Sequence, residues 1–160
     1  MPLVLSHATP QDAARISEIH MAAFGSNEML LAQFPTPAIR AALRNSIERK
    51  ALADIDDPKT SVLVVRELET MQGDPGVGGE RNDVGRGKII SFAKWSHPVE
   101  EGEDYSEPQW VWPEGTERDI LEKWTKVVDE AQEKVLGREP SYRELLASPQ
   151  FVVFLAIKLR

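Results

Sequence analysis

The chain has 160 residues, with 19 basic and 26 acidic side chains and a formal net charge of −7. Its composition, 41% hydrophobic and 28% charged, is typical of a globular protein, and its length fits a single domain over residues 1–160. The absence of cysteine excludes disulfides, a thiolate nucleophile and cysteine-ligated zinc or iron–sulfur sites. The acidic balance disfavours general nucleic-acid binding, because phosphate contacts require clustered Lys and Arg side chains.

The sequence also disfavours a membrane protein. No apolar run approaches the roughly 18 residues that a membrane-spanning helix needs. The N-terminus carries no basic residue before an apolar stretch, which is not the pattern of a signal peptide. We therefore expect a cytoplasmic protein.

The N-terminal third of the chain predicts one strand and two helical regions. Residues 3–8 form a short apolar run that predicts a strand. Thr9 and Pro10 suit the start of a helix, and Gly25 suits its end, with a further short turn over residues 26–31. Thr36 and Pro37 then predict a longer helix. Its apolar positions recur every fourth residue, at Ile39, Leu43, Ile47 and Ala51, and its polar residues Arg40, Arg44, Glu48 and Lys50 are expected to cover the exposed side.

Two strands are predicted in the middle of the chain. Residues 61–68 contain a continuous β-branched run typical of a strand buried on both faces, and residues 88–96 form a second candidate. Between them, residues 69–87 are rich in glycine and charge, which predicts a flexible hairpin loop. Because the two strands are adjacent in sequence, we expect them to pair as a hairpin.

An acidic, proline-punctuated loop is predicted over residues 98–115. Its carboxylates Glu100, Glu101, Glu103 and Asp104 suit either a solvated surface or a region that attracts a cationic acceptor such as an amine. Trp110 and Trp112, two residues apart, either form an aromatic wall for a ligand or pin the loop onto the domain by burial. We favour the interpretation that the two tryptophans pin the loop onto the domain by burial.

The C-terminal part predicts a long helix and further strands. The helix runs from Glu117 to Leu136, with an expected buried stripe of Ile120, Trp124, Val127, Val128, Ala131 and Val135. Residues 142–147 fit a strand or one helical turn, and residues 151–159 fit an apolar strand. The mixture of helices and strands predicts an α/β or α+β fold with at least one helix layer on a sheet.

Few residues carry a chemical signature of their own. The three histidines, His7, His20 and His97, have no metal-ligand spacing, so no metal site is predicted. His20 falls at the edge of an apolar helix face, where a satisfied, partly buried histidine is expected. His97 follows the second central strand, and strand ends are common positions for functional residues. The glycines at 85 and 87 lead into a strand rather than a helix, which does not fit a phosphate loop.

Several local patterns together resemble one family. They are residues 8–24 with the continuation Gly25-Ser26-Asn27, the segment 87–95 (GKIISFAKW), and Trp112-Pro113-Glu114-Gly115 leading into the long helix. In this order the segments resemble the GCN5-related N-acetyltransferases, especially those of the fungal branch, over roughly the first 140 residues. The resemblance implies a strand, two helices and a meander of strands in a mixed central sheet with flanking helices. It also implies a splayed parallel strand pair that holds acetyl-CoA.

The resemblance implies an activity and a set of site residues. Such enzymes transfer an acetyl group from acetyl-CoA to an amine by direct attack, with a base that removes the amine proton. The backbone of Leu145, Leu146 and Ala147 would contact the cofactor. The acceptor, a small-molecule or peptide amine, would contact Phe24 and Asn27, with Trp95, Trp110 and Trp112 as further candidates. His97 or a carboxylate of the acidic loop would be the base.

The chain departs from the family pattern at its C-terminus. The family follows this strand with a loop of the form Gln/Arg-x-x-Gly-x-Gly/Ala, whereas here no glycine follows Gly137 and residues 150–160 are an atypical apolar strand. A truncated acetyltransferase with weak or no acetyl-CoA binding is one expectation. A non-catalytic binding or assembly module, associating as a homo-oligomer through this strand, is the alternative. A small-ligand binder that uses the tryptophans is a third.

Overall fold

The computed structural model describes residues 2–68, 87–100, 102–136 and 143–144. Three expectations fall outside these residues: most of the 69–87 loop, the strand at 150–160, and the cofactor contacts of Leu145, Leu146 and Ala147.

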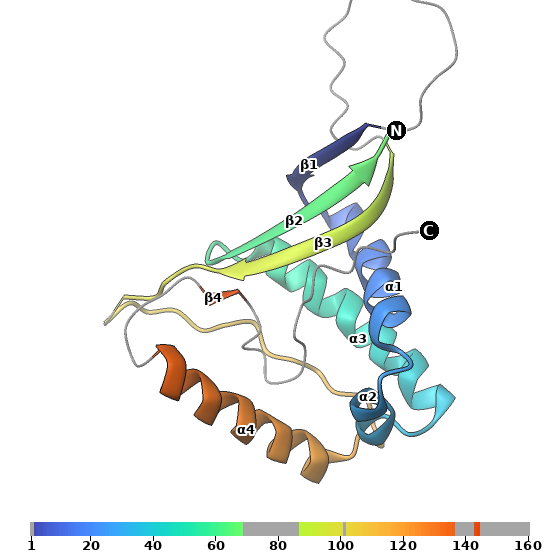
Figure 1. Cartoon of the computed structure of the whole chain (residues 1–160). Helices are drawn as coiled ribbons and strands as arrows, with labels where there is room; N and C mark the ends of the chain where they lie inside the picture. Colours follow the sequence, from blue (N-terminus) through green and yellow to red (C-terminus); the bar gives the residue numbers. More distant parts are fainter. Residues whose placement is uncertain (1, 69–86, 101, 137–142, 145–160) are drawn as a thin grey trace, which may run out of the picture.

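A four-stranded antiparallel sheet forms the centre of the described fold (Figure 1). Its order is β1 (Leu3–His7), β2 (Thr60–Glu67), β3 (Lys88–Ser96) and β4 (Arg143–Glu144). The pairing of β2 with β3 confirms the predicted hairpin, and β4 confirms the strand alternative at residues 143–144. The described strand pairings are antiparallel, and the α/β class with helices flanking a sheet is confirmed.

Four α-helices accompany the sheet in the described part of the chain: α1 (Ala13–Phe24), α2 (Glu28–Gln33), α3 (Pro37–Asp56) and α4 (Arg118–Leu136). A short 3₁₀ turn over Pro10–Asp12 precedes α1. The predicted start of α3 is confirmed, because the Thr36 hydroxyl accepts a hydrogen bond from the Ile39 N–H at 3.2 Å and Pro37 occupies the first helical position.

Helices α1 and α3 pack together on one face of the sheet (Figure 1). This contact buries the first core cluster, which draws side chains from α1, α3, β2 and β3: Ala13, Ile16, Ile19, Ala51, Val62, Val64, Ile89 and Phe92. A second core cluster lies at the other end of α3, where Leu30, Phe34, Leu43 and Ile47 pack together. Helix α3 therefore joins two apolar clusters.

The burial of β2 differs from the expectation of a strand covered on both faces. Thr60, Val62, Val64 and Arg66 are buried, whereas the alternate residues are only half-buried. The reason is that α1 and α3 cover one face of the sheet, and successive side chains of a strand point to opposite faces.

The expected buried stripe of α4 is also wrong in part. Val127 is 58% exposed and Ala131 is exposed, whereas Leu121, outside the expected stripe, is buried. Helix α4 packs against α2 and lies apart from the sheet (Figure 1), and Leu121, the buried residue among those of α4 whose burial is described, belongs to its first turn. Periodicity predicted the helix correctly but not the surface it contacts.

Candidate functional site

Residues 97–100 and 102–117 lie along α3 as a strap that connects β3 to α4 (Figure 1). Near the end of α3, the Tyr105 hydroxyl donates a hydrogen bond to Asp57 Oδ2 at 2.7 Å. Further along, Glu107 contacts Lys50. At the far end, the Glu117 N–H donates to the Gln33 carbonyl at 2.9 Å. The predicted surface loop is therefore an ordered strap that is attached at several points.

An ionic cluster lies beneath the strap. Lys50, Asp54 and Lys94 form its buried part, and Glu107 is its exposed member. The Lys50 ammonium donates to Asp54 Oδ1 and, at 3.2 Å, to Glu107 Oε1. The Lys94 ammonium donates to Asp54 Oδ2 at 2.7 Å. The side chains of Lys50 and Asp54 are each 3% exposed and that of Lys94 is 11% exposed. Two ammonium groups thus share one buried carboxylate.

Local structure explains how these side chains meet. Lys50 and Asp54 are four residues apart on α3 and therefore lie on the same helix face. Lys94 pairs with Val62 across the sheet, and paired residues share a face, so its side chain points towards α3. Burial lowers the pKa of Lys94, and the negative charge of Asp54 opposes this effect.

His20 lies beside this cluster. Its side chain is buried, which agrees with the expectation from the sequence, and its ring centroid is 5.0 Å from that of Phe24. Burial, and secondly the positive charge of Lys94, lower the pKa of His20 to about 4. The imidazole is therefore neutral near pH 7.

Trp110 and Trp112 anchor the strap. Their rings are stacked, with centroids 4.9 Å apart and an interplanar angle of 10°, and Trp112 also stacks on Phe34 at 6.0 Å. Both pack against the second core cluster, as does Phe24. The Lys50 ammonium lies 6.0 Å from the Trp110 ring centroid. These contacts support the interpretation that the tryptophans pin the strap to the domain.

His97 and Trp95 belong to a different region from the ionic cluster. His97 Nε2 lies 2.8 Å from the Ser61 hydroxyl, and the His97 N–H donates to the Lys59 carbonyl. Ser61 pairs with Trp95 across the sheet, and both alternate with side chains that face α1 and α3. Trp95, which is 37% exposed, thus lies on the sheet face away from these helices, next to Glu144 of β4.

The predicted acceptor residues are consequently not brought together as one set. Phe24, Trp110 and Trp112 share the second core cluster, whereas Trp95 lies across the sheet. Asn27 caps α2, because its Oδ1 accepts hydrogen bonds from the N–H groups of Met29 and Leu30 at 2.9 and 3.4 Å.

The sequence analysis missed the ionic cluster, and its placement of Lys50 on the exposed side of α3 is wrong. Lys50 follows the buried Leu43 by seven residues, and Asp54 follows Leu43 by eleven. Both spacings place a residue on the same buried stripe of a helix as Leu43. This periodicity was a usable signal for both residues. Nothing local indicated the contact with Glu107, which lies 57 residues from Lys50.

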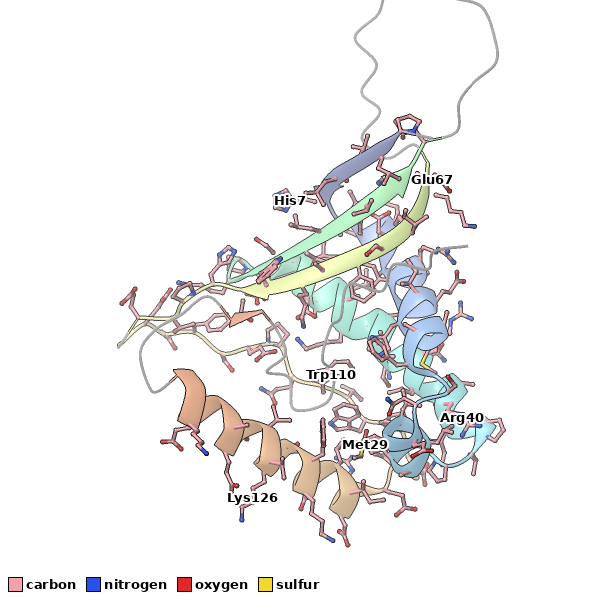
Figure 2. All side chains as sticks on the ribbon, viewed as in Figure 1. His7, Met29, Arg40, Glu67, Trp110 and Lys126 are labelled. Atoms are coloured by element: carbon pink, nitrogen blue, oxygen red, sulfur yellow. The ribbon has the colours of Figure 1, made fainter. Side chains whose placement is uncertain are left out.

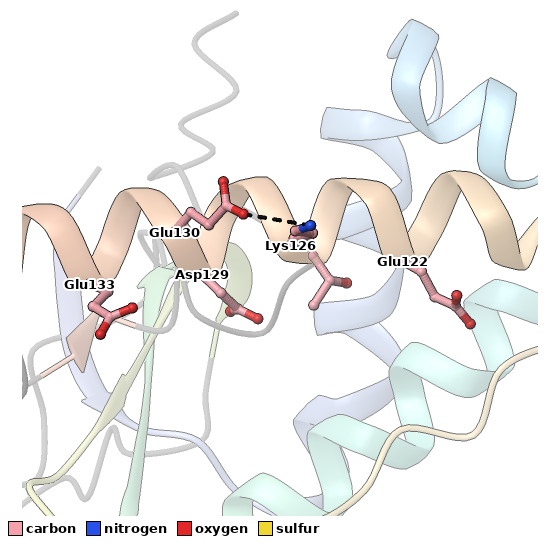
Figure 3. A pocket seen from close by; sticks show the side chains of 6 residues that line it. Glu122, Lys126, Asp129, Glu130 and Glu133 are labelled. Carbon is pink, nitrogen blue, oxygen red and sulfur yellow. Dashed lines mark ion pairs between the residues drawn. The ribbon is translucent and has the colours of Figure 1, made fainter.

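A shallow depression runs along α4 (Figure 3). It is lined by Glu122, Thr125, Lys126, Asp129, Glu130 and Glu133, all from this one helix. Lys126 and Glu130 form a long ion pair of 3.9 Å between exposed side chains. In the part of the chain that the structure describes, no group of three or more His, Asp or Glu residues is arranged to hold a metal ion.

No protein-family model and no curated protein matches the chain. A solved structure from Corynebacterium glutamicum, described as histone acetyltransferase HPA2 and related acetyltransferase, is similar over 71% of this chain and 56% of that chain, with 16% sequence identity and a TM-score of 0.37. A similarity at this level supports no argument about fold or function. Among the described helices, none is long and apolar enough to cross a membrane.

Proposed function

We propose that this chain is an acyltransferase-type domain related to the GCN5-related N-acetyltransferases, with an amine as acceptor and acetyl-CoA as co-substrate. The observation that supports the proposal is the order of its elements. Strand β1, the helical region α1–α3 and the antiparallel pair β2–β3 follow one another along the chain, which is the order that the sequence resemblance implies. After α4, the strand β4 joins β3 in the sheet. The residues implied in cofactor binding, 145–147, follow β4 directly in the sequence.

In the proposed reaction the neutral amine attacks the thioester carbonyl and forms the new C–N bond. The C–S bond breaks, the coenzyme A thiolate leaves with the electron pair, and a base takes the amine proton. His97 is the proposed base. Its imidazole lies at the end of β3, near β4, and is oriented by the Ser61 hydroxyl at 2.8 Å. Glu103 suits this role less well, because its hydrogen bond with Lys59 lowers the pKa of the carboxyl and makes it a weaker base.

Calorimetric titration with acetyl-CoA tests binding, and an acetylation assay over a panel of small amines and lysine peptides tests transfer. We expect weak but saturable binding, because no glycine follows Gly137 to form the family's pyrophosphate loop, and transfer to at least one acceptor. His97→Gln is expected to lower kcat by about 10²-fold or more, with the affinity for acetyl-CoA unchanged. His7→Gln is the matched control, because His7 is exposed at the end of β1 (Figure 2). Absence of binding at millimolar acetyl-CoA would contradict the proposal.

A non-catalytic binding or assembly module is the second candidate. The observation that favours it is the pairing of strap carboxylates with lysines of the same chain: Glu103 with Lys59, and Glu107 with Lys50. Carboxylates engaged in this way are less available to attract a cationic acceptor. For this candidate, light scattering after size-exclusion chromatography should show a homo-oligomer, with no heat from acetyl-CoA. A monomer at high protein concentration would count against the assembly version.

A further inference from the structure

We propose that Lys50 and Lys94 form a binding subsite for the carboxylate group of a small ligand, and that the side chain of Glu107 occupies this subsite in the free protein. The subsite lies on the helix side of the sheet, whereas His97 lies near the opposite face. It is therefore separate from the proposed base.

The charge balance of the cluster is the first argument. Lys50 and Lys94 both donate to Asp54, so the three most deeply buried groups carry two positive charges and one negative charge. A buried charge without a partner is strongly unfavourable. Glu107 supplies the second negative charge. Glu107 is therefore the anionic member of the cluster that neither α3 nor β3 provides, while Asp57, at the end of α3, also acts electrostatically on Lys50.

The exposure of Glu107 is the second argument. Its side chain is 40% exposed, whereas its partner Lys50 is 3% exposed. It comes from the strap rather than from a helix or strand, and its contact with Lys50 is 3.2 Å, compared with 2.7 Å between Lys94 and Asp54. Rotation of this one side chain would remove the Glu107 contact from the Lys50 ammonium, while Tyr105 and Trp112 keep the strap attached to the domain.

The surroundings define the chemical class of the ligand. The Trp110 ring lies 6.0 Å from the Lys50 ammonium and offers an apolar surface beside the charge. His20, which is neutral near pH 7, adds no charge to the site. A planar carboxylate attached to a small apolar group matches this combination, since the carboxylate reproduces the contact that Glu107 makes.

Formate and acetate are suitable probes, with chloride at the same ionic strength as reference. In Glu107→Ala the internal carboxylate is removed, so we expect either carboxylate to raise the midpoint of thermal unfolding. We expect an apparent Kd at least tenfold lower than in the unmodified protein. Glu103→Ala is the matched control, because it removes another strap carboxylate that pairs with a lysine outside the cluster. The rise in unfolding midpoint that formate or acetate produces in Glu103→Ala should equal the rise in the unmodified protein.

Two further variants keep the test decisive. Glu107→Gln preserves the size of the side chain but not its charge, and it replaces Glu107→Ala in the test if that variant does not fold. Glu107→Gln should show the same preference for formate over chloride. In a double variant that adds Lys50→Met to the Glu107 change, formate and acetate should no longer raise the unfolding midpoint above that in chloride. Equal carboxylate affinity with and without Glu107, or a response that survives the loss of Lys50, would overturn the proposal.

Discussion

His20 shows how the position of one side chain makes stability depend on pH. Its pKa falls from 6.5 to about 4 because the ring is buried and Lys94 is positively charged. Between these two pH values the unfolded chain binds a proton that the folded protein excludes. The free energy of unfolding therefore decreases as pH falls through this window, by roughly 3 kcal/mol in total.

The variant His20→Gln isolates this contribution. Glutamine does not titrate, so the variant should lose less stability than the unmodified protein between about pH 7 and pH 4, with the difference approaching the same roughly 3 kcal/mol. Urea unfolding at a series of pH values measures the two curves. His7→Gln, at an exposed position, should follow the unmodified protein. Parallel curves for His20→Gln and the unmodified protein would show that His20 is not the cause.

At the scale of elements, the first turn of α2 is capped by the side chain of Asn27. This helix has six residues, and the Asn27 side chain accepts hydrogen bonds from two N–H groups of its first turn. Such short helices are marginal without capping and tertiary contacts. The cap thus provides a structural explanation for a residue that the family resemblance assigned to the acceptor site.

Substitution of Asn27 separates the two roles. Asn27→Ala should lower the free energy of unfolding by about 1 kcal/mol, because two N–H groups lose their acceptor. Asn27→Asp should be close to neutral, since Asp caps helices about as well as Asn. Urea unfolding measures both variants. If Asn27→Ala leaves stability unchanged but weakens binding of an amine acceptor, the acceptor role is the correct one.

At the scale of the whole molecule, α3 connects the two core clusters. It contributes Ala51 to the cluster beneath the sheet, and Leu43 and Ile47 to the cluster that holds the strap tryptophans. Because one continuous helix carries both contacts, loss of either cluster removes support from the other. We therefore expect the described part of the chain to unfold in a single cooperative transition.

Two spectroscopic probes test this cooperativity. In a variant with Trp95→Phe and Trp124→Phe, fluorescence reports only Trp110 and Trp112 in the second cluster. Far-ultraviolet circular dichroism reports the helices and the sheet together. The urea midpoints from the two probes should coincide. A fluorescence transition at clearly lower urea would show that the strap and second cluster detach before the sheet unfolds.

Local sequence patterns were sufficient for most element boundaries. Thr36 and Pro37 start α3, residues 88–96 form β3 at the predicted bounds, and Glu117 directly precedes α4. These features depend on capping, backbone preference and periodicity within a few residues, so neighbouring residues determine them. The sequence by itself thus determined the order of elements and the mixed α/β class.

Only the tertiary structure decided which surfaces meet. The burial of Lys50, the exposure of Val127 and the contact between Glu107 and Lys50 depend on where the strap and α4 lie relative to α3. A helix pattern defines an apolar face but not the surface that it contacts. Charged residues on that face are buried where opposite charges compensate them: Lys50 and Asp54 pair within α3, and Lys94 and Glu107 come from elsewhere in the chain. The ionic cluster beneath the strap therefore belongs to the fold as a whole, because its partners come from α3, β3 and the strap.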